Sequence, residues 1–316
     1  MGEKTIGKAE RLLQIEMLLL DHPEGLTQAE IARRTGVNRS SISRSVDELT
    51  SQFPIHQEDD GRLVLDRDAY LSHVRLTLHE ALAVHLATRL LAVWSDKHNP
   101  YAASALRKLG ESLRRLAPLI AGHMKASADE MDSLLRRQDA GYLRVMETLT
   151  RAWSDGLKVR VWHEMDDGSV HNYDFAPYFI EPYLWGHTSH VVGWREPPGK
   201  VRTLKLERIQ RVELQKHAHY SIPADFDPRQ YLANAWGIWT SEQPLQDVVL
   251  RFHPRVRTRV LETRWHPNEK VEELADGYLL WHAQVAEPRE MLPWIRGWGA
   301  DVEVIETKQL LSLIHI

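Results

Sequence analysis

The sequence predicts an α+β protein of several domains, and three observations lead to this fold class. The chain has 316 residues, which exceeds the usual size of one domain. Apolar residues recur at helical spacing in the first half of the chain, whereas from Leu157 onward they alternate as in strands. We expect a winged helix-turn-helix at 1–70, a helical linker at 71–155, a small β-barrel at 156–220, a linker followed by an open sheet with helices at 221–306, and a tail at 307–316.

Composition limits the classes of protein to which the chain can belong. It contains no cysteine, which excludes disulfides and thiolate metal sites and favours a reducing, cytoplasmic compartment. No apolar stretch approaches the roughly 20 residues of a membrane span, so we expect no membrane association. The net charge of −4 argues against a generally basic surface, but the charged residues within Ile31–Val46 are all arginines. A local positive face is therefore possible.

The first module begins with an amphipathic helix over Lys8–Leu20, whose apolar residues have three- and four-residue spacing. Thr27 and Glu30 then form a capping box, in which hydroxyl and carboxylate bond to the unpaired amides of a helix start. The box predicts a short helix over Gln28–Thr35. Gly36 can adopt the left-handed conformation that ends this helix.

A second short helix follows the glycine turn. Asn38 is a good N-cap for it, and it is expected to run to about Leu49. In a helix-turn-helix the second helix lies in the major groove, where Arg can bind guanine through two hydrogen bonds, Asn can pair with adenine and Ser suits phosphates. The predicted DNA-binding residues are Thr27, Gln28, Asn38, Arg39, Ser40, Ser41, Ser43, Arg44 and Arg62.

Two short strands predict a wing after these helices. Ile55–Gln57 and Leu63–Leu65 flank a turn that contains Asp60-Gly61, a strong hairpin signal. Each element alone is common, so a three-helix cap with an incidental hairpin is the alternative. The order of helix, capped helix, glycine turn, Arg/Ser-rich helix and hairpin favours DNA binding.

The predicted linker consists of helices. Thr77 and Glu80 repeat the capping box ahead of a helix that is apolar on more than one side, and Pro118 is expected to break the next helix. Because so wide an apolar surface needs a second partner, we expect these helices to help form a two-fold dimer, with packing inside one chain as the alternative. The predicted helices cover 77–94, 99–116 and 139–153.

Short strands separated by Gly- and Pro-rich turns follow the helices. Together they predict a compact barrel closed by the segment 207–209. The predicted strands cover 157–165, 169–175, 177–183, 189–194 and 201–206.

This pattern resembles the WYL-domain transcriptional regulators, in which a winged helix-turn-helix precedes an Sm/SH3-like WYL barrel and a C-terminal extension called WCX. In that family a proline-led strand precedes a glycine turn, and an Arg-containing strand ends in Asp-Arg-Ile. The matching segments here are Ala176-Pro177-Tyr178, Gly186, Arg202–Leu206 and Glu207-Arg208-Ile209. The Trp-Tyr-Leu that names the family is replaced by Ser189-His190-Val191.

The C-terminal part resembles WCX more closely. From Leu245 to Ile305 the pattern follows the strand-helix-strand-strand-helix-strand order of that domain, which implies a ferredoxin-like arrangement. Family members continue with a proline and another helix, whereas this chain continues with Thr307–Ile316.

The resemblance implies a homodimer that binds a double-stranded DNA operator and controls transcription, with repression favoured. Some relatives regulate CRISPR, phage-defence or DNA-damage genes. The effector in the family is anionic, often a nucleotide or a nucleic-acid fragment, and Arg, Lys and His side chains can bind such an anion; solvated cations at a barrel edge are the alternative. The candidate ligand-binding residues are His190, Arg195, Arg202, Lys205 and Arg208.

No catalytic site, cofactor or metal is predicted. His187, His190, His217 and His219 lack the spacing of a zinc motif, and Gly297-Trp298-Gly299 lacks the third glycine of a dinucleotide fingerprint. An enzyme with an appended regulatory winged helix, comparable to the biotin ligase repressors, is the alternative function. The nucleotide loop of those enzymes is not seen, so we expect no enzymatic activity.

Overall fold

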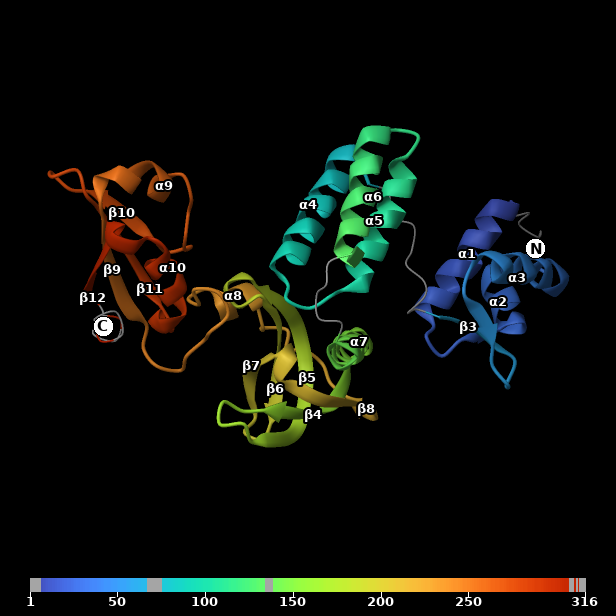
Figure 1. Ribbon diagram of the computed structural model, residues 1–316. Coiled ribbons are helices and arrows are strands. Elements are labelled where there is room, and N and C mark those ends of the chain that lie inside the picture. The colour runs from blue at the N-terminus through green and yellow to red at the C-terminus, as the bar shows by residue number, and fades with distance from the viewer. Residues whose placement is uncertain (1–6, 67–75, 134–138, 307–309, 311, 313–316) are drawn as a thin grey trace. The chain divides into compact units, whose positions relative to one another are not determined.

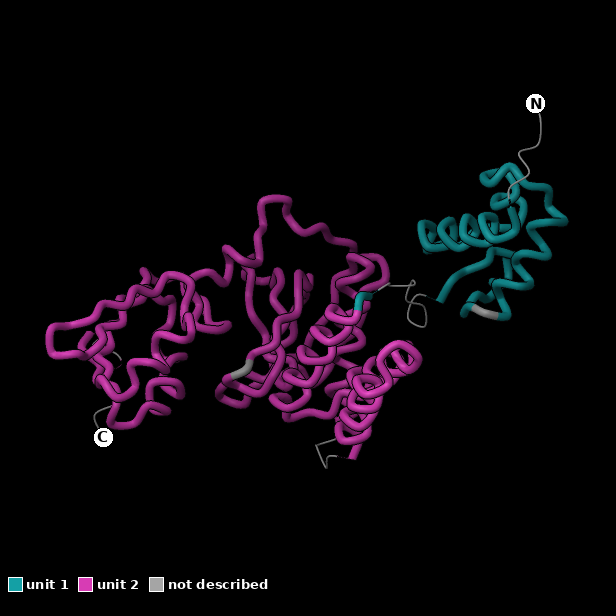
Figure 2. The backbone as a smooth tube through the Cα atoms, turned by 90° about the horizontal axis from the view of Figure 1, so that it is seen from above, with its two compact units in different colours: residues 1–77 teal, residues 78–316 magenta. Residues whose placement is uncertain are grey.

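The computed structural model describes residues 7–66, 76–133, 139–306, 310 and 312. The chain divides into two compact units, residues 1–77 and 78–316, coloured separately in Figure 2. The boundary that the sequence analysis placed at residue 70 lies outside the described residues. In the parts of the chain that the structure describes, no helix has the combination of length and hydropathy that crossing a bilayer requires.

Unit 1, drawn in blue in Figure 1, has the three predicted helices and the predicted hairpin, and one short strand, β1, that was not predicted lies between the first two helices. Its strands form an antiparallel sheet in the order β1-β3-β2. The second helix has the predicted bounds, and the third continues three residues beyond the predicted Leu49. The elements are α1 (Lys8–Asp21), β1 (Leu26–Thr27), α2 (Gln28–Thr35), α3 (Arg39–Gln52), β2 (Ile55–Gln57) and β3 (Arg62–Leu65).

Local signals explain the turn between α2 and α3. The predicted capping box is confirmed, since Thr27 accepts a hydrogen bond from the Glu30 amide while the Glu30 carboxylate accepts one from the Thr27 amide at 2.8 Å. Gly36 ends α2 with φ +69°, in the left-handed region. Ile15, Leu26 and other apolar side chains of α1–α3 and the sheet form one buried core beneath this turn.

Four helices follow in unit 2, and the first three lie side by side in Figure 1. Two predictions for this region were wrong. The second helix ends at Leu113 rather than Leu116, and Pro118 begins a further helix instead of only ending the preceding one. Proline fits the first turn of a helix because the amide it lacks would be unpaired there. The helices are α4 (Leu78–Trp94), α5 (Pro100–Leu113), α6 (Pro118–Ser133) and α7 (Ala140–Asp155).

The next segment forms a five-stranded antiparallel sheet in the order β7-β6-β5-β4-β8. The predicted barrel closure is not confirmed, because β7 and β8 lie at opposite edges of the described sheet. Two predicted strands merge into β5, where the register with β6 shifts between Pro177 and Phe179; such an irregularity accommodates a residue without an amide hydrogen. The strands are β4 (Leu157–Glu164), β5 (Val170–Tyr183), β6 (Thr188–Glu196), β7 (Lys200–Lys205) and β8 (Ile209–His219).

Helix α7 covers one face of this sheet. Its residues Tyr142, Val145 and Leu149 are buried in a core with Val159 of β4 and Leu206, the residue that follows β7. Burial of such side chains stabilises the contact by roughly 1.5–3 kcal/mol each. The segment after β8, with α8 (Pro228–Leu232), packs aromatic residues against the sheet in a separate cluster.

A four-stranded antiparallel sheet in the order β10-β11-β9-β12 completes the unit. The strand-helix-strand-strand-helix-strand order expected here is present, and the ferredoxin-like description stays a prediction. Five tryptophans, at positions 236, 265, 281, 294 and 298, contribute to its core, into which Leu310 also packs. The elements are β9 (Gln246–Phe252), α9 (Arg257–Leu261), β10 (Lys270–Glu273), β11 (Leu279–Val285), α10 (Leu292–Gly297) and β12 (Val302–Glu306).

Candidate functional site

Helix α3 presents cationic side chains on the surface opposite its packed side. Ile42, Val46 and Leu49 are buried in the core of unit 1, and Arg39 and Arg44 are exposed. Exposed arginines in the N-terminal half of a recognition helix can reach base edges in a major groove. Helix α3 is therefore the candidate DNA-contacting element of unit 1.

Asn38 is engaged in the cap of α3. Its Oδ1 atom accepts hydrogen bonds from the Ser41 amide and from the Ser40 hydroxyl, both at 2.9 Å. A paired contact with adenine would need this oxygen as well as the amide nitrogen, so the main role of Asn38 here is to start the helix. Ser41 and Ser43 are half-buried, whereas Ser40 is exposed beside the arginines.

Among the remaining predicted DNA-binding residues, Thr27 and Arg62 make contacts within unit 1. Thr27 belongs to the capping box, and Gln28 is half-buried at the start of α2. The guanidinium of Arg62 donates to the Gly25 carbonyl at 2.9 Å and pairs with Asp60 at 3.1 Å. The bond to Gly25 joins the hairpin to the segment ahead of β1, so a DNA contact from Arg62 would require an exchange of partners.

The tip of the hairpin is acidic. Glu58, Asp59 and Asp60 are all exposed there, and His56 lies 3.1 Å from the Glu58 carboxylate. Because carboxylates repel the phosphates of DNA, the tip does not favour close approach to a duplex. The run of acids at this turn, Glu58 to Asp60, is visible in the sequence. Within unit 1, α3 rather than the hairpin tip is the candidate contact.

Unit 2 contains a polar cleft of about 1310 Å³ against the five-stranded sheet. Its lining includes residues of β4, β6 and β7, residues 238–243, and Glu287 and Arg289 ahead of α10. Four of the five predicted ligand-binding residues line this cleft: His190, Arg202, Lys205 and Arg208.

Arg195, the fifth predicted residue, is not part of the cleft lining. Its guanidinium carbon lies 3.9 Å from the centre of the Tyr173 ring, a favourable cation–π geometry. Its Nε is buried and has no hydrogen-bond partner among the described residues. The structure thus places Arg195 in the packing of the sheet rather than at the cleft surface.

Arg202 and Arg208 of the cleft are paired with exposed carboxylates. Arg202 lies 3.0 Å from Glu242, which also receives a hydrogen bond from Lys200 at 2.8 Å. These bonds, that from Lys200 first, hold the pKa of Glu242 below its usual value. Arg208 pairs with Asp166. Exposed ion pairs of this kind contribute little net free energy, so an incoming anion can replace the carboxylates at small cost.

Two buried histidines face the same cleft. His190 is 6% exposed and His163 is 8% exposed, and burial, followed by nearby cations, lowers the pKa of each to about 4. Nδ1 of His190 and both ring nitrogens of His163 have no hydrogen-bond partner among the described residues. Both rings are therefore neutral near pH 7, and their unpartnered nitrogens are buried behind the cleft surface.

Sequence reasoning missed several residues of the cleft. His163 lies on β4, two strands away from His190 on β6, and no local pattern links the two residues. Trp239 and Arg289 come from later parts of the chain. Only their residue types, an aromatic and a cation, were visible in the sequence.

A buried carboxylate positions one wall of the cleft. Glu290 is 2% exposed and accepts hydrogen bonds from the backbone amides of Gly237 at 2.9 Å, Ile238 at 2.7 Å and Trp239 at 3.1 Å. Burial nevertheless raises the pKa of Glu290, because desolvation outweighs these bonds. A Cβ atom at Gly237 would lie 2.6 Å from the Tyr183 ring, so only glycine fits this contact.

Comparison with solved structures gives distant similarities. The chain is 17% identical to proteasome accessory factor B/C (PafBC) of Arthrobacter aurescens, with 96% of this chain and 45% of that chain covered and a TM-score of 0.30. It is 9% identical to a CRISPR Cas-related protein, with coverages of 77% and 85% and a TM-score of 0.37. The metal-dependent transcriptional regulator MtsR is 14% identical, with coverages of 67% and 100% and a TM-score of 0.17. No curated protein sequence matches the chain.

Domain families give closer assignments. Residues 17–62 match the MarR family, residues 144–214 match the WYL domain and residues 244–314 match the WCX domain. The three segments contain α3, the sheet that carries His190, and the sheet with the tryptophan core. The chain therefore carries a MarR-type winged helix, a WYL domain and a WCX domain, in that order.

Proposed function

We propose that this protein is a DNA-binding transcription regulator whose WYL and WCX domains sense an anionic ligand. The observation that carries the proposal is the surface of α3, where Arg39, Ser40 and Arg44 are exposed while the opposite side is buried. The chain as a whole is acidic, so this local face, rather than overall charge, supports binding to DNA.

The polar cleft is the proposed effector site. Arg202, Lys205 and Arg208 supply positive charge, and His163 and His190 also line the cleft. Trp239 adds an aromatic surface. Phosphates prefer arginine donors, and bases stack on aromatic rings. These features support a nucleotide or a short single-stranded nucleic acid as the effector class.

A homodimer is the proposed assembly. Helix α4 carries exposed apolar side chains at Leu86 (59% exposed), Leu90 (50%) and Val93 (58%), which share one helix face by their spacing. Its other side packs in unit 2 through Ala81. A solvent-facing apolar stripe of this kind is typical of an interface, and two-fold association is the commonest case.

Regulation would follow from differential binding. An effector that binds one arrangement of the dimer more tightly than another changes operator affinity by the same coupling free energy. Repression is the output that we favour. CRISPR, phage-defence and DNA-damage genes are the candidate targets, by resemblance to the family.

Selection of duplexes from a randomised pool by the purified full chain tests this function. We expect enrichment of a specific, two-fold related sequence by the wild type and loss of enrichment by the Arg39→Ala/Arg44→Ala variant. Arg114→Ala, which removes an exposed arginine directly after α5 in unit 2, is the matched control. Failure of the wild type to enrich any sequence in dilute salt would contradict the proposal.

A further inference from the structure

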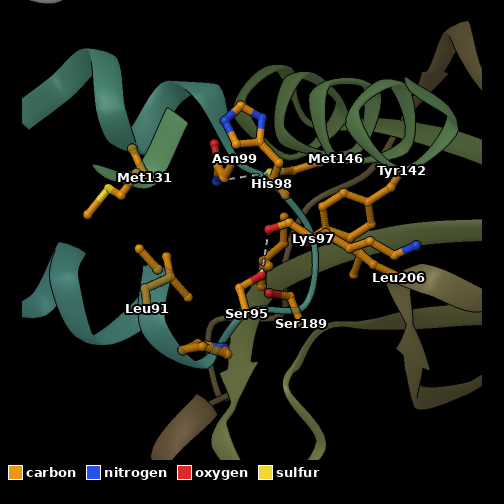
Figure 3. A pocket seen from close by; sticks show the side chains of 14 residues that line it. Leu91, Ser95, Lys97, His98, Asn99, Met131, Tyr142, Met146, Ser189 and Leu206 are labelled. Carbon is orange, nitrogen blue, oxygen red and sulfur yellow. Dashed lines mark hydrogen bonds between the residues drawn. The ribbon is translucent and has the colours of Figure 1, made fainter. Parts of the chain in front are cut away.

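A second, smaller cavity lies in unit 2 where the segment joining α4 to α5 meets α7 and the five-stranded sheet. Its volume is about 190 Å³, and Figure 3 shows the side chains around it. Leu91 comes from α4, Met131 from α6, Tyr142 and Met146 from α7, and Ser189 from β6. None of these residues lines the polar cleft.

The wall of this cavity is mainly apolar. Aliphatic and thioether side chains cover most of it, and methionine adapts its shape to irregular ligands. The apolar lining residues are Leu91, Ala92, Ala102, Met131, Met146, Ile180, Pro182 and Leu206.

The polar groups at the cavity are already paired within the protein. Lys97 donates to Asp139 at 2.8 Å, which offsets its charge. Asn99 accepts from the Tyr101 amide at 3.1 Å and contacts the Met146 sulfur. The Tyr142 hydroxyl bonds to Ser189, and burial raises the pKa of Tyr142 to about 12. The cavity thus has no unbalanced charge to attract an ion, while its hydroxyls can exchange hydrogen bonds with a neutral guest.

The volume of the cavity limits the size of the ligand that it can bind. A dry apolar cavity of ~150 Å³ accepts benzene in another protein, so 190 Å³ is enough for one substituted ring. Ligand sites are typically apolar with a few polar groups that fix orientation. Tyr142 and Ser189 supply such groups at one side of this cavity.

We propose that this cavity is a second ligand site, which binds a small, uncharged, single-ring molecule carrying one hydroxyl group. The site is separate from the polar cleft and does not depend on the proposed function. It is built from both the helical segment and the WYL sheet, so its occupant would bind to the contact between them.

Titration of the full chain with 4-fluorophenol, followed by ¹⁹F NMR, tests the proposal. We expect saturable binding with a Kd in the millimolar range or below. Ala102→Leu on α5 fills the cavity and should weaken binding at least about tenfold. Ala105→Leu, the same change at an exposed position of the same helix, should leave binding unchanged.

Further measurements separate a ligand site from a simple packing void. The anion 4-fluorobenzoate should bind far more weakly than 4-fluorophenol, because the cavity has no free cation; equal binding would overturn the assignment. Thermal unfolding shows whether Ala102→Leu is folded, and if it is not, Ala92→Leu on α4 takes its place. No saturable binding to wild type, or undiminished binding to a folded cavity-filling variant, would reject the proposal.

Discussion

Ser189 and His190 are consecutive residues of β6, and their side chains line two different cavities. Ser189 borders the small apolar cavity together with Pro182, its partner in the β5–β6 register. His190 borders the polar cleft together with Lys205, its partner on β7. Alternation along a strand places successive side chains on opposite faces of a sheet. The segment that replaces the name-giving tripeptide of the family therefore separates the two candidate ligand sites.

Loss of an arginine from α3 should weaken operator binding. Arg44→Ala is expected to cost about 1–3 kcal/mol if the side chain binds a base through two hydrogen bonds. Fluorescence anisotropy with the selected duplex measures this cost. Arg229→Ala, at a position whose side chain is 92% exposed in unit 2, serves as the control. An affinity unchanged by both Arg39→Ala and Arg44→Ala would remove these residues from the readout.

Loss of the cleft arginines should separate effector sensing from DNA binding. The Arg202→Ala/Arg208→Ala variant is expected to bind the operator like the wild type when no effector is present, because both residues lie in unit 2. Its affinity for a labelled single-stranded DNA pentamer should fall at least about tenfold, the effect of losing charge-assisted contacts. Anisotropy measures both affinities. A pentamer affinity equal to that of wild type would reject the cleft assignment.

The buried histidines predict a pH dependence of stability. Because His163 and His190 have a pKa of about 4 in the folded chain, against about 6.5 when unfolded, only the unfolded chain gains protons as the pH first falls below 6.5. The contribution of the two histidines to the free energy of unfolding is complete above pH 6.5. It is lost as the pH falls toward 4, by up to about 3 kcal/mol for each histidine.

Urea unfolding followed by tryptophan fluorescence measures this loss between about pH 7.5 and pH 5. A folded His163→Leu/His190→Leu variant should lose less stability across this interval than the wild type. His217→Leu, at an exposed position on β8, should behave like the wild type. Parallel stability curves for the double variant and the wild type would contradict the prediction.

Charge on the exposed face of α4 should dissociate the dimer. Leu86→Glu with Leu90→Glu places two like charges on the face proposed for two-fold contact, where burial without partners is costly. Light scattering coupled to size exclusion should report a dimer for the wild type and a monomer for the variant. Ser112→Glu, an exposed position on α5, should remain dimeric. A monomeric wild type would reject the dimer. A dimer that the double substitution does not affect would place the interface away from this face of α4.

Short-range interactions made the helices of the winged helix predictable from the sequence. The capping box of Thr27 and Glu30, the left-handed turn at Gly36 and the cap at Asn38 each act within a few residues, so α2 and α3 were predicted almost residue by residue. The same logic failed at Pro118, because a proline that ends one helix can equally begin the next. Local patterns also predicted two strands where β5 is one, since its irregularity at Pro177 is resolved only by pairing with β6.

The sequence by itself determined the domain order, the exposed arginines of α3 and four residues that line the polar cleft. Only the tertiary structure brought His163 to the same cleft as His190, turned Arg195 onto Tyr173 and placed Glu290 against the amides that follow Gly237. The physical reason is distance along the chain. Helix starts and turns depend on neighbouring residues, whereas strand register, burial and the packing of the C-terminal domain depend on contacts between segments far apart in the sequence.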